Sequence, residues 1–191
     1  MDDAAVALTR HKLDVDAFYR MAEAGILAQD DRVELIDGEL IDMRPIGTDH
    51  AATVNGLTRT LVMACGTQAI VRVQNPIRLD RFNEPQPDVA VVRPRADNYR
   101  SGGHPTAPDV LLLAEVADSS LRFDREVKLP LYARFGITEL WIVDLVRRKL
   151  DAYRNPAGDE YAAMHTYVTG DRITFGIAPK IELTIESSVF D

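Results

Sequence analysis

Several features are missing from this sequence. It has one cysteine, Cys65, which excludes a disulfide framework within the chain and a four-cysteine zinc site. No run of about 18 apolar residues occurs, so neither a transmembrane helix nor a membrane partner is expected. The first twelve residues lack the basic-then-apolar pattern of a secretory signal, and we therefore expect a cytoplasmic location.

An excess of positive charge is also missing. Lys and Arg together number 22 against 30 Asp and Glu, which gives a net charge of −8. This balance argues against a protein that coats nucleic acid by bulk charge. An enzyme with a local basic groove stays open, because net charge does not determine local fields.

The familiar catalytic and nucleotide-binding signatures are absent as well. The sequence has no phosphate-cradling GxxxxGK[ST], no GxGxxG, no GxSxG nucleophile elbow and no HExxH. Its four histidines are scattered without the spacing of metal ligands.

What is present is the composition of an ordinary globular protein. Of the 191 residues, 46% are hydrophobic and 27% are charged, and this length can bury one sizeable core. No repeat, low-complexity tract or linker divides the chain. We therefore expect a single domain over residues 1–191.

The first part of the chain predicts two helices separated by a hairpin. Apolar spacing indicates a helix over 14–24, and the run from Thr48 to about Cys65 indicates a second one. Between them, alternating runs flank Asp37-Gly38, which is typical of a type I′ turn.

The remainder is dominated by predicted strands. Residues 109–116 form an almost unbroken apolar run and should be a central strand buried on both faces. Residues 124–135 have a helical pattern, with an irregular first turn because of Pro130. A long polar loop over 94–108 and turns at 155–158 and 170–171 are expected. Further strands are predicted over 69–73, 76–79, 87–93, 137–145, 150–155, 161–168 and 172–175. The order predicts an α/β or α+β fold with a mixed sheet.

Acidic residues inside apolar strands are the strongest functional signal. Glu115 stands near the end of the apolar run, where a buried carboxylate must be paired, protonated or bound to a cation. Asp88 heads the strand at 87–93. Each has a structural alternative: Asp88 as a solvated strand-entry acid, and Glu115 as a solvated residue if its strand ends at Ala114.

Four other polar residues are further candidates for a functional site. A short loop would bring Lys128 close to Glu115, with Tyr132 on the same helical face, although a surface Lys–Glu pair is the commoner outcome. Glu34 lies in the hairpin, where a solvent-facing position is the alternative. His50 lies in the first turn of the second helix, where a boundary histidine is the alternative to a ligand.

These residue types together have one chemical meaning. Carboxylates that converge repel one another, and a divalent cation relieves the repulsion; oxygen ligands suit Mg²⁺ or Mn²⁺. Such a metal lowers the pKa of a bound water and neutralises charge on a phosphodiester, while a nearby lysine stabilises developing charge.

Several motifs occur in order over roughly residues 14–155. They are RVELIDGELIDM at 32–43, QNP at 74–76, PDVAVV at 87–92, LLAEVADSS at 112–120 and DREVKLPLYARFGITELWIVD at 124–144. With these motifs the sequence resembles the Uma-type family of restriction-endonuclease-like proteins in the PD-(D/E)XK nuclease superfamily.

The resemblance implies a role for each matching residue. Asp88 and Glu115 would hold the metal, and Glu34 would complete its shell or bind a second ion. The superfamily's strand lysine is replaced here by Ala117, and the family pattern gives its role to Lys128. His50 and Gln74 match supporting positions. Many relatives have serine where this chain has Asp118. The extra negative charge at this position would change the affinity for substrate.

Three functions follow from the sequence as hypotheses. The first is a Mg²⁺- or Mn²⁺-dependent endonuclease that cleaves DNA. The second is a catalytically inactive, dimeric binding or regulatory module of the same fold, and the third is a hydrolase of another phosphorylated substrate. A homodimer is expected from general frequency alone. The loop arginines Arg93, Arg95 and Arg100 face a phosphate or simply keep the loop soluble.

Overall fold

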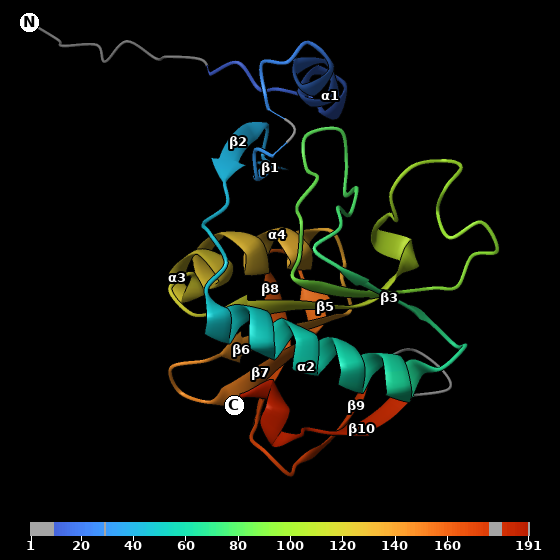
Figure 1. The fold of residues 1–191 in the computed structure, drawn as a ribbon, viewed down its shortest axis with the longest axis vertical. Helices are drawn as coiled ribbons and strands as arrows, with labels where there is room; N and C mark the ends of the chain where they lie inside the picture. Colours follow the sequence, from blue (N-terminus) through green and yellow to red (C-terminus); the bar gives the residue numbers. More distant parts are fainter. Residues whose placement is uncertain (1–9, 29, 176–180, 191) are drawn as a thin grey trace, which may run out of the picture. The chain divides into compact units, whose positions relative to one another are not determined.

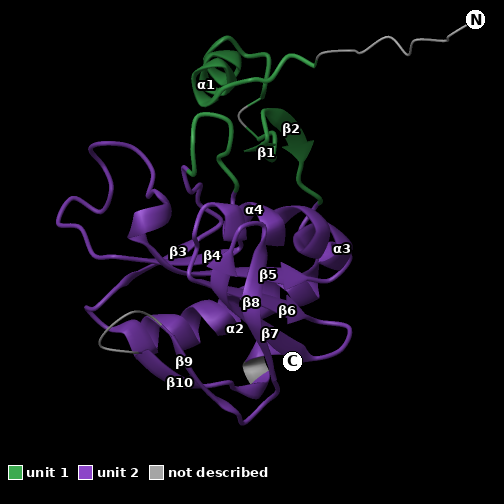
Figure 2. Ribbon diagram, turned by 180° about the vertical axis from the view of Figure 1, so that it is seen from behind, with its two compact units in different colours: residues 1–44, 79–85 green, residues 45–78, 86–191 purple. Residues whose placement is uncertain are grey.

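The computed structural model describes residues 10–28, 30–175 and 181–190. The chain folds into two compact units (Figure 2): unit 1 comprises residues 1–44 and 79–85, and unit 2 comprises residues 45–78 and 86–191. The expected single domain stays a prediction. Among the described residues, every helix is too short or too polar to cross a membrane.

Unit 1 contains one helix and one hairpin. Helix α1 (Val15–Glu23) is capped by Asp14, whose side chain accepts a hydrogen bond from the Ala17 backbone N–H at 2.8 Å. Strands β1 (Val33–Ile36) and β2 (Glu39–Asp42) pair antiparallel. Asp37 and Gly38 both have positive φ, 50° and 76°, which is the two-residue type I′ turn that the sequence predicts.

Unit 2 is built on a sheet whose described strands number six, in the order β3-β4-β5-β6-β7-β8. The pair β5–β6 is parallel and the other pairs are antiparallel. The strands are β3 (Ile70–Val73), β4 (Val89–Val92), β5 (Val110–Ala117), β6 (Glu139–Asp144), β7 (Lys149–Ala157) and β8 (Glu160–Tyr167). The predicted mixed α/β fold is therefore confirmed.

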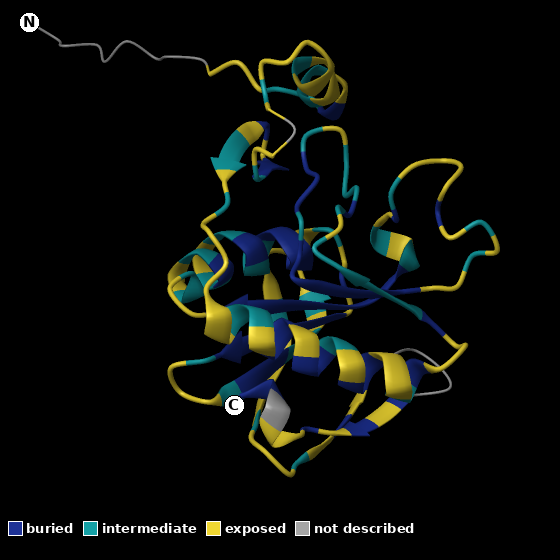
Figure 3. Ribbon diagram, in the orientation of Figure 1, coloured by how far each residue is buried: buried dark blue, intermediate teal, exposed yellow. Residues whose placement is uncertain are grey.

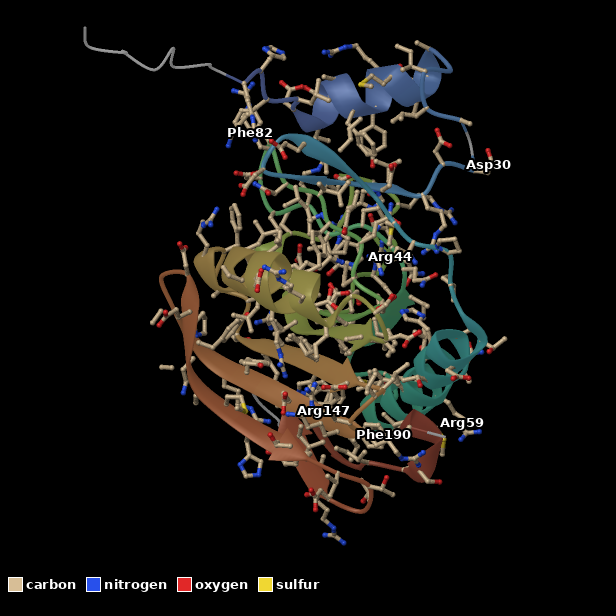
Figure 4. The ribbon with its side chains drawn as sticks, turned by 90° about the vertical axis from the view of Figure 1, so that its left-hand side faces the viewer. Asp30, Arg44, Arg59, Phe82, Arg147 and Phe190 are labelled. Carbon is tan, nitrogen blue, oxygen red and sulfur yellow. The ribbon has the colours of Figure 1, made fainter. Side chains whose placement is uncertain are left out.

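Helix α2 (Thr48–Cys65) covers one face of this sheet (Figure 1). Its buried side chains pack against alternate residues of the strands and against a second hairpin, β9 (Arg172–Phe175) with β10 (Ile181–Thr184). A 3₁₀ helix, η3 (Ser187–Val189), also packs on α2; Figure 4 labels Arg59 and Phe190 in this region. Both faces of β5 are covered, so all eight of its residues are buried (Figure 3), as the apolar run predicts.

The opposite face of the sheet carries an irregular helical segment. It consists of α3 (Leu121–Phe123), a π-helical stretch η2 (Asp124–Lys128) and α4 (Leu129–Arg134). Pro130 has no N–H and its ring clashes with the preceding turn, so a regular helix cannot run through it. The expected irregular start is confirmed, and this segment is also the crossover that parallel β5 and β6 require.

Two predicted elements differ from the structure. Residues 76–79 are not a strand, because β3 and β4 pair directly with each other (Val73 opposite Val89) and leave no ladder position for them. The turn expected at 155–158 comes later, because β7 runs to Ala157. Pairing with β6 ends at Arg154, so Pro156 lies where its missing N–H costs no bond to β6.

The packing of α2 generates a stability prediction. Leu57→Ala should lower the free energy of unfolding by about 2–5 kcal/mol, because Leu57 is 1% exposed and its loss leaves a cavity. Met63→Ala on the same helix, 77% exposed, should change it by less than about 0.5 kcal/mol. Urea unfolding of the two variants measures both; equal effects would contradict this burial pattern.

Candidate active site

Three strands of unit 2 bring polar residues into one row. The β4–β5 register pairs Val89 with Ala114, so one step further places Asp88 opposite Glu115. The backbone N–H of Gln74 donates to the Asp88 carbonyl at 3.0 Å, which extends the β3–β4 ladder to the same level. Residues far apart in the sequence therefore meet at one end of three adjacent strands.

The row lies on the face of the sheet opposite α2, and His50 in the first turn of that helix reaches it. Residues Val73, Val89, Ala114 and Val116 contribute to the core beneath α2. Because side chains alternate between the faces of a strand, Asp88 and Glu115 belong to the other face, which carries α4.

Glu115 is held in a buried ion pair. It is 2% exposed, and its Oε1 accepts a hydrogen bond from the Tyr132 hydroxyl at 2.7 Å and lies 3.2 Å from Lys128 Nζ. The Lys128 side chain is only 6% exposed. Removing either charge would leave the other one buried without compensation, which is strongly unfavourable.

The π-helical stretch ends at Lys128, and α4 carries Tyr132 one turn later. Single π-helical turns inside helices are frequently found at functional sites. Here the irregular segment presents an ammonium and a hydroxyl to the same carboxylate oxygen.

Asp88 receives hydrogen bonds from three different elements. Its Oδ2 lies 3.1 Å from His50 Nε2 and accepts from the Val116 backbone N–H at 2.8 Å, while Oδ1 accepts from Gln74 Nε2 at 3.2 Å. Burial acts to raise the pKa of Asp88, but the hydrogen bond and charge of His50, the Val116 N–H and the charge of Lys128 outweigh it. The pKa of Asp88 is thus lowered, and its carboxylate is ionised at neutral pH.

Gln74 contributes from a strained backbone. Its φ is +48°, in the left-handed region that costs an L-residue about 1–2 kcal/mol. Such outliers persist where the surroundings hold them and cluster at functional sites. From this conformation the side-chain amide of Gln74 donates its hydrogen bond to Asp88.

The structure brings together six of the seven residues singled out in the sequence: Gln74, His50, Asp88, Glu115, Lys128 and Tyr132. Asp88 and Glu115 are buried, so the alternatives that placed them in solvent are wrong, and the Lys128–Glu115 pair is not a surface pair. Ala117 is buried, while Asp118 is exposed.

Glu34 is the seventh and lies on β1 of unit 1. It is 2% exposed, so the solvent-facing alternative is wrong for this residue too. Its part in a metal site stays a prediction.

One buried acid near this segment was missed by sequence reasoning. Asp124 is 3% exposed and accepts a hydrogen bond from the Ser120 hydroxyl at 2.7 Å. It begins the π-helical stretch that ends at Lys128. The pattern in the sequence that could have identified Asp124 is its position four residues before Lys128 in the predicted helix.

The donor set fits a hard divalent cation. Asp88 and Glu115 offer carboxylate oxygens, the ligands that Mg²⁺ and Mn²⁺ take, and Mg²⁺ is commonly bound by one or two carboxylates together with water and substrate phosphate. Among the described residues, no group of three or more His, Cys, Asp or Glu side chains has the arrangement of a metal site. A cation would therefore rest on two carboxylates of unit 2.

Comparison with known proteins places this chain in a family. The family model Uma2, described as "Putative restriction endonuclease", matches residues 15–186. The chain belongs to this family. The comparison with curated proteins found no match.

A solved structure from Anabaena variabilis, described as "a putative nuclease belonging to DUF820", has a similar fold. The TM-score is 0.62 at 13% sequence identity, and the match covers 83% of this chain and 86% of the other. The family supports a nuclease role, and the similar structure shows the fold.

The buried ion pair generates a coupling prediction. Lys128→Met should lower the free energy of unfolding by about 3–5 kcal/mol at neutral pH, because Glu115 would keep a buried charge without its cation. Adding Glu115→Gln should recover a large part of the loss, as measured by urea unfolding.

Arg134→Met serves as the control. The side chains of Arg134 and its partner Asp159 are 46% and 62% exposed, so this pair should contribute less than about 1 kcal/mol to the free energy of unfolding. A double variant no more stable than Lys128→Met alone would contradict the coupling.

Proposed function

We propose that this protein is a nuclease that hydrolyses DNA phosphodiester bonds with the help of a carboxylate-bound divalent cation. The single observation that carries the proposal is that Asp88 and Glu115 are buried at the ends of adjacent strands, with Lys128 of the crossover segment 3.2 Å from Glu115. Family membership supports the same class of chemistry.

In this proposal, Asp88 and Glu115 hold Mg²⁺ or Mn²⁺. When bound, such an ion would lower the pKa of a water molecule and neutralise charge on the phosphodiester.

The chain's own residues have the following roles. Asp88 is kept ionised and oriented by His50, Gln74 and the Val116 N–H. Tyr132 fixes the position of Glu115 through its hydroxyl. Lys128 places a positive charge at the carboxylates, where it stabilises the negative charge that develops on the phosphate oxygens in the transition state.

A cleavage assay on duplex and single-stranded DNA with Mg²⁺ or Mn²⁺ tests the proposal. Asp88→Asn, Glu115→Gln and Lys128→Met should each lower the cleavage rate by about 10²–10³-fold, the order seen when a group that stabilises the transition state is removed.

Asp159→Asn is the matched control, because this carboxylate is exposed and lies at the β7–β8 turn. Cleavage rates in the site variants equal to that of Asp159→Asn would remove these residues from the mechanism. A wild-type protein that binds DNA without cleaving it would support the dimeric binding module instead.

A further inference from the structure

A second polar residue of β3 shares the face of the proposed site. Val71 and Val73 pack toward α2, so Arg72 between them belongs to the opposite face. Arg72 pairs in register with Ala90, two residues from the level at which Gln74 meets Asp88. At about 3.4 Å per residue, this spacing places Arg72 roughly 7 Å along the strand from the carboxylate row.

The charge of Arg72 has no carboxylate partner. Among the described residues, Arg72 forms no salt bridge, and its Nε is buried without a hydrogen-bond partner. Burial lowers the pKa of its guanidinium, and only the charge of Tyr99 opposes this. Other half-buried arginines of unit 2 are paired, such as Arg125 with Asp151 and Arg154 with Glu139.

An aromatic ring positions Arg72 instead. The guanidinium carbon lies 5.8 Å from the centre of the Tyr99 ring, and that of Arg95 lies 4.6 Å from the same ring. Stacking on an aromatic face orients a guanidinium without using its N–H donors. Arg72 is therefore held in place, while the terminal N–H groups of its guanidinium form no hydrogen bond or ion pair with the described residues.

The loop that supplies Tyr99 is tightly organised. Tyr99 is 7% exposed, and its hydroxyl donates to the Arg93 carbonyl at 2.8 Å. Asp97 accepts from the backbone N–H groups of Tyr99 and Ser101. Tyr99 has a φ of +63°, a genuine outlier for a bulky residue. A loop that only kept the chain soluble would not need a buried tyrosine in a strained conformation.

We propose that Arg72, stacked on Tyr99, binds a backbone phosphate of the nucleic acid strand next to the phosphate that is cleaved. Guanidinium groups bind phosphate oxygens through two parallel hydrogen bonds, and such contacts fix the position of a nucleic acid. Arg95 on the same ring is paired with Asp97 at 3.0 Å, so the inference rests on Arg72. This inference rests on the proposed nuclease function and assigns the loop of residues 93–101 to substrate binding.

Equilibrium binding of a fluorescein-labelled, mixed-sequence DNA duplex tests the inference without relying on cleavage. Fluorescence anisotropy over a series of salt concentrations, in the absence of divalent metal, compares wild type with Arg72→Gln and Arg72→Lys. Arg72→Gln should weaken binding roughly tenfold and lower the slope of log K against log salt by about 0.9, the value for one phosphate contact. Arg72→Lys should keep the slope while losing part of the affinity, because it keeps the charge but not the planar fork.

Arg59→Gln is the matched control. Arg59 lies on α2, on the other side of the sheet, and its side chain is 62% exposed. This variant should bind the duplex as wild type does.

The outcomes separate the two proposals. If wild type binds and cleaves DNA while Arg72→Gln matches Arg59→Gln in affinity and slope, the role of Arg72 is overturned and the nuclease function stands. If wild type neither binds nor cleaves, the nuclease function fails and the inference fails with it. Thermal unfolding checks that the variants fold; should Arg72→Gln not fold, Arg72→Lys with the affinity of wild type would overturn the role by itself.

Discussion

Negative charge buried at the ends of β4 and β5 has to be balanced locally, and the surrounding structure supplies that balance. Asp88 and Glu115 are both less than a tenth exposed. Left alone, two such carboxylates would protonate or destabilise the fold. Lys128 forms an ion pair with Glu115, and the Tyr132 hydroxyl donates a hydrogen bond to it. His50 and Gln74 form hydrogen bonds with Asp88.

The irregular parts of unit 2 are consistent with this demand. Between β5 and β6 the crossover is not a regular helix but a π-helical turn that ends at Lys128. Gln74 adopts a left-handed backbone beside its bond to Asp88. Both of these irregular points lie at the carboxylates.

Much of this arrangement could be predicted from the sequence, and the reasons are local. The hairpin followed from Asp37-Gly38, β5 from its apolar run, and the candidate residues from acids and a lysine in apolar surroundings. What could not be predicted depends on register and tertiary context. The alignment of Gln74, Asp88 and Glu115, the direct pairing of β3 with β4, and the stacking of Arg72 on Tyr99 join segments far apart in the chain.

The central claim is that Asp88 and Glu115 form one cation-binding pocket. A crystal structure of the protein soaked in Mn²⁺, with the ion located by its anomalous scattering, tests this claim most directly. The account predicts an anomalous peak within direct coordination distance of an oxygen from each of the two carboxylates. A peak elsewhere, or carboxylates that hold only Lys128 in the presence of saturating Mn²⁺, would contradict it.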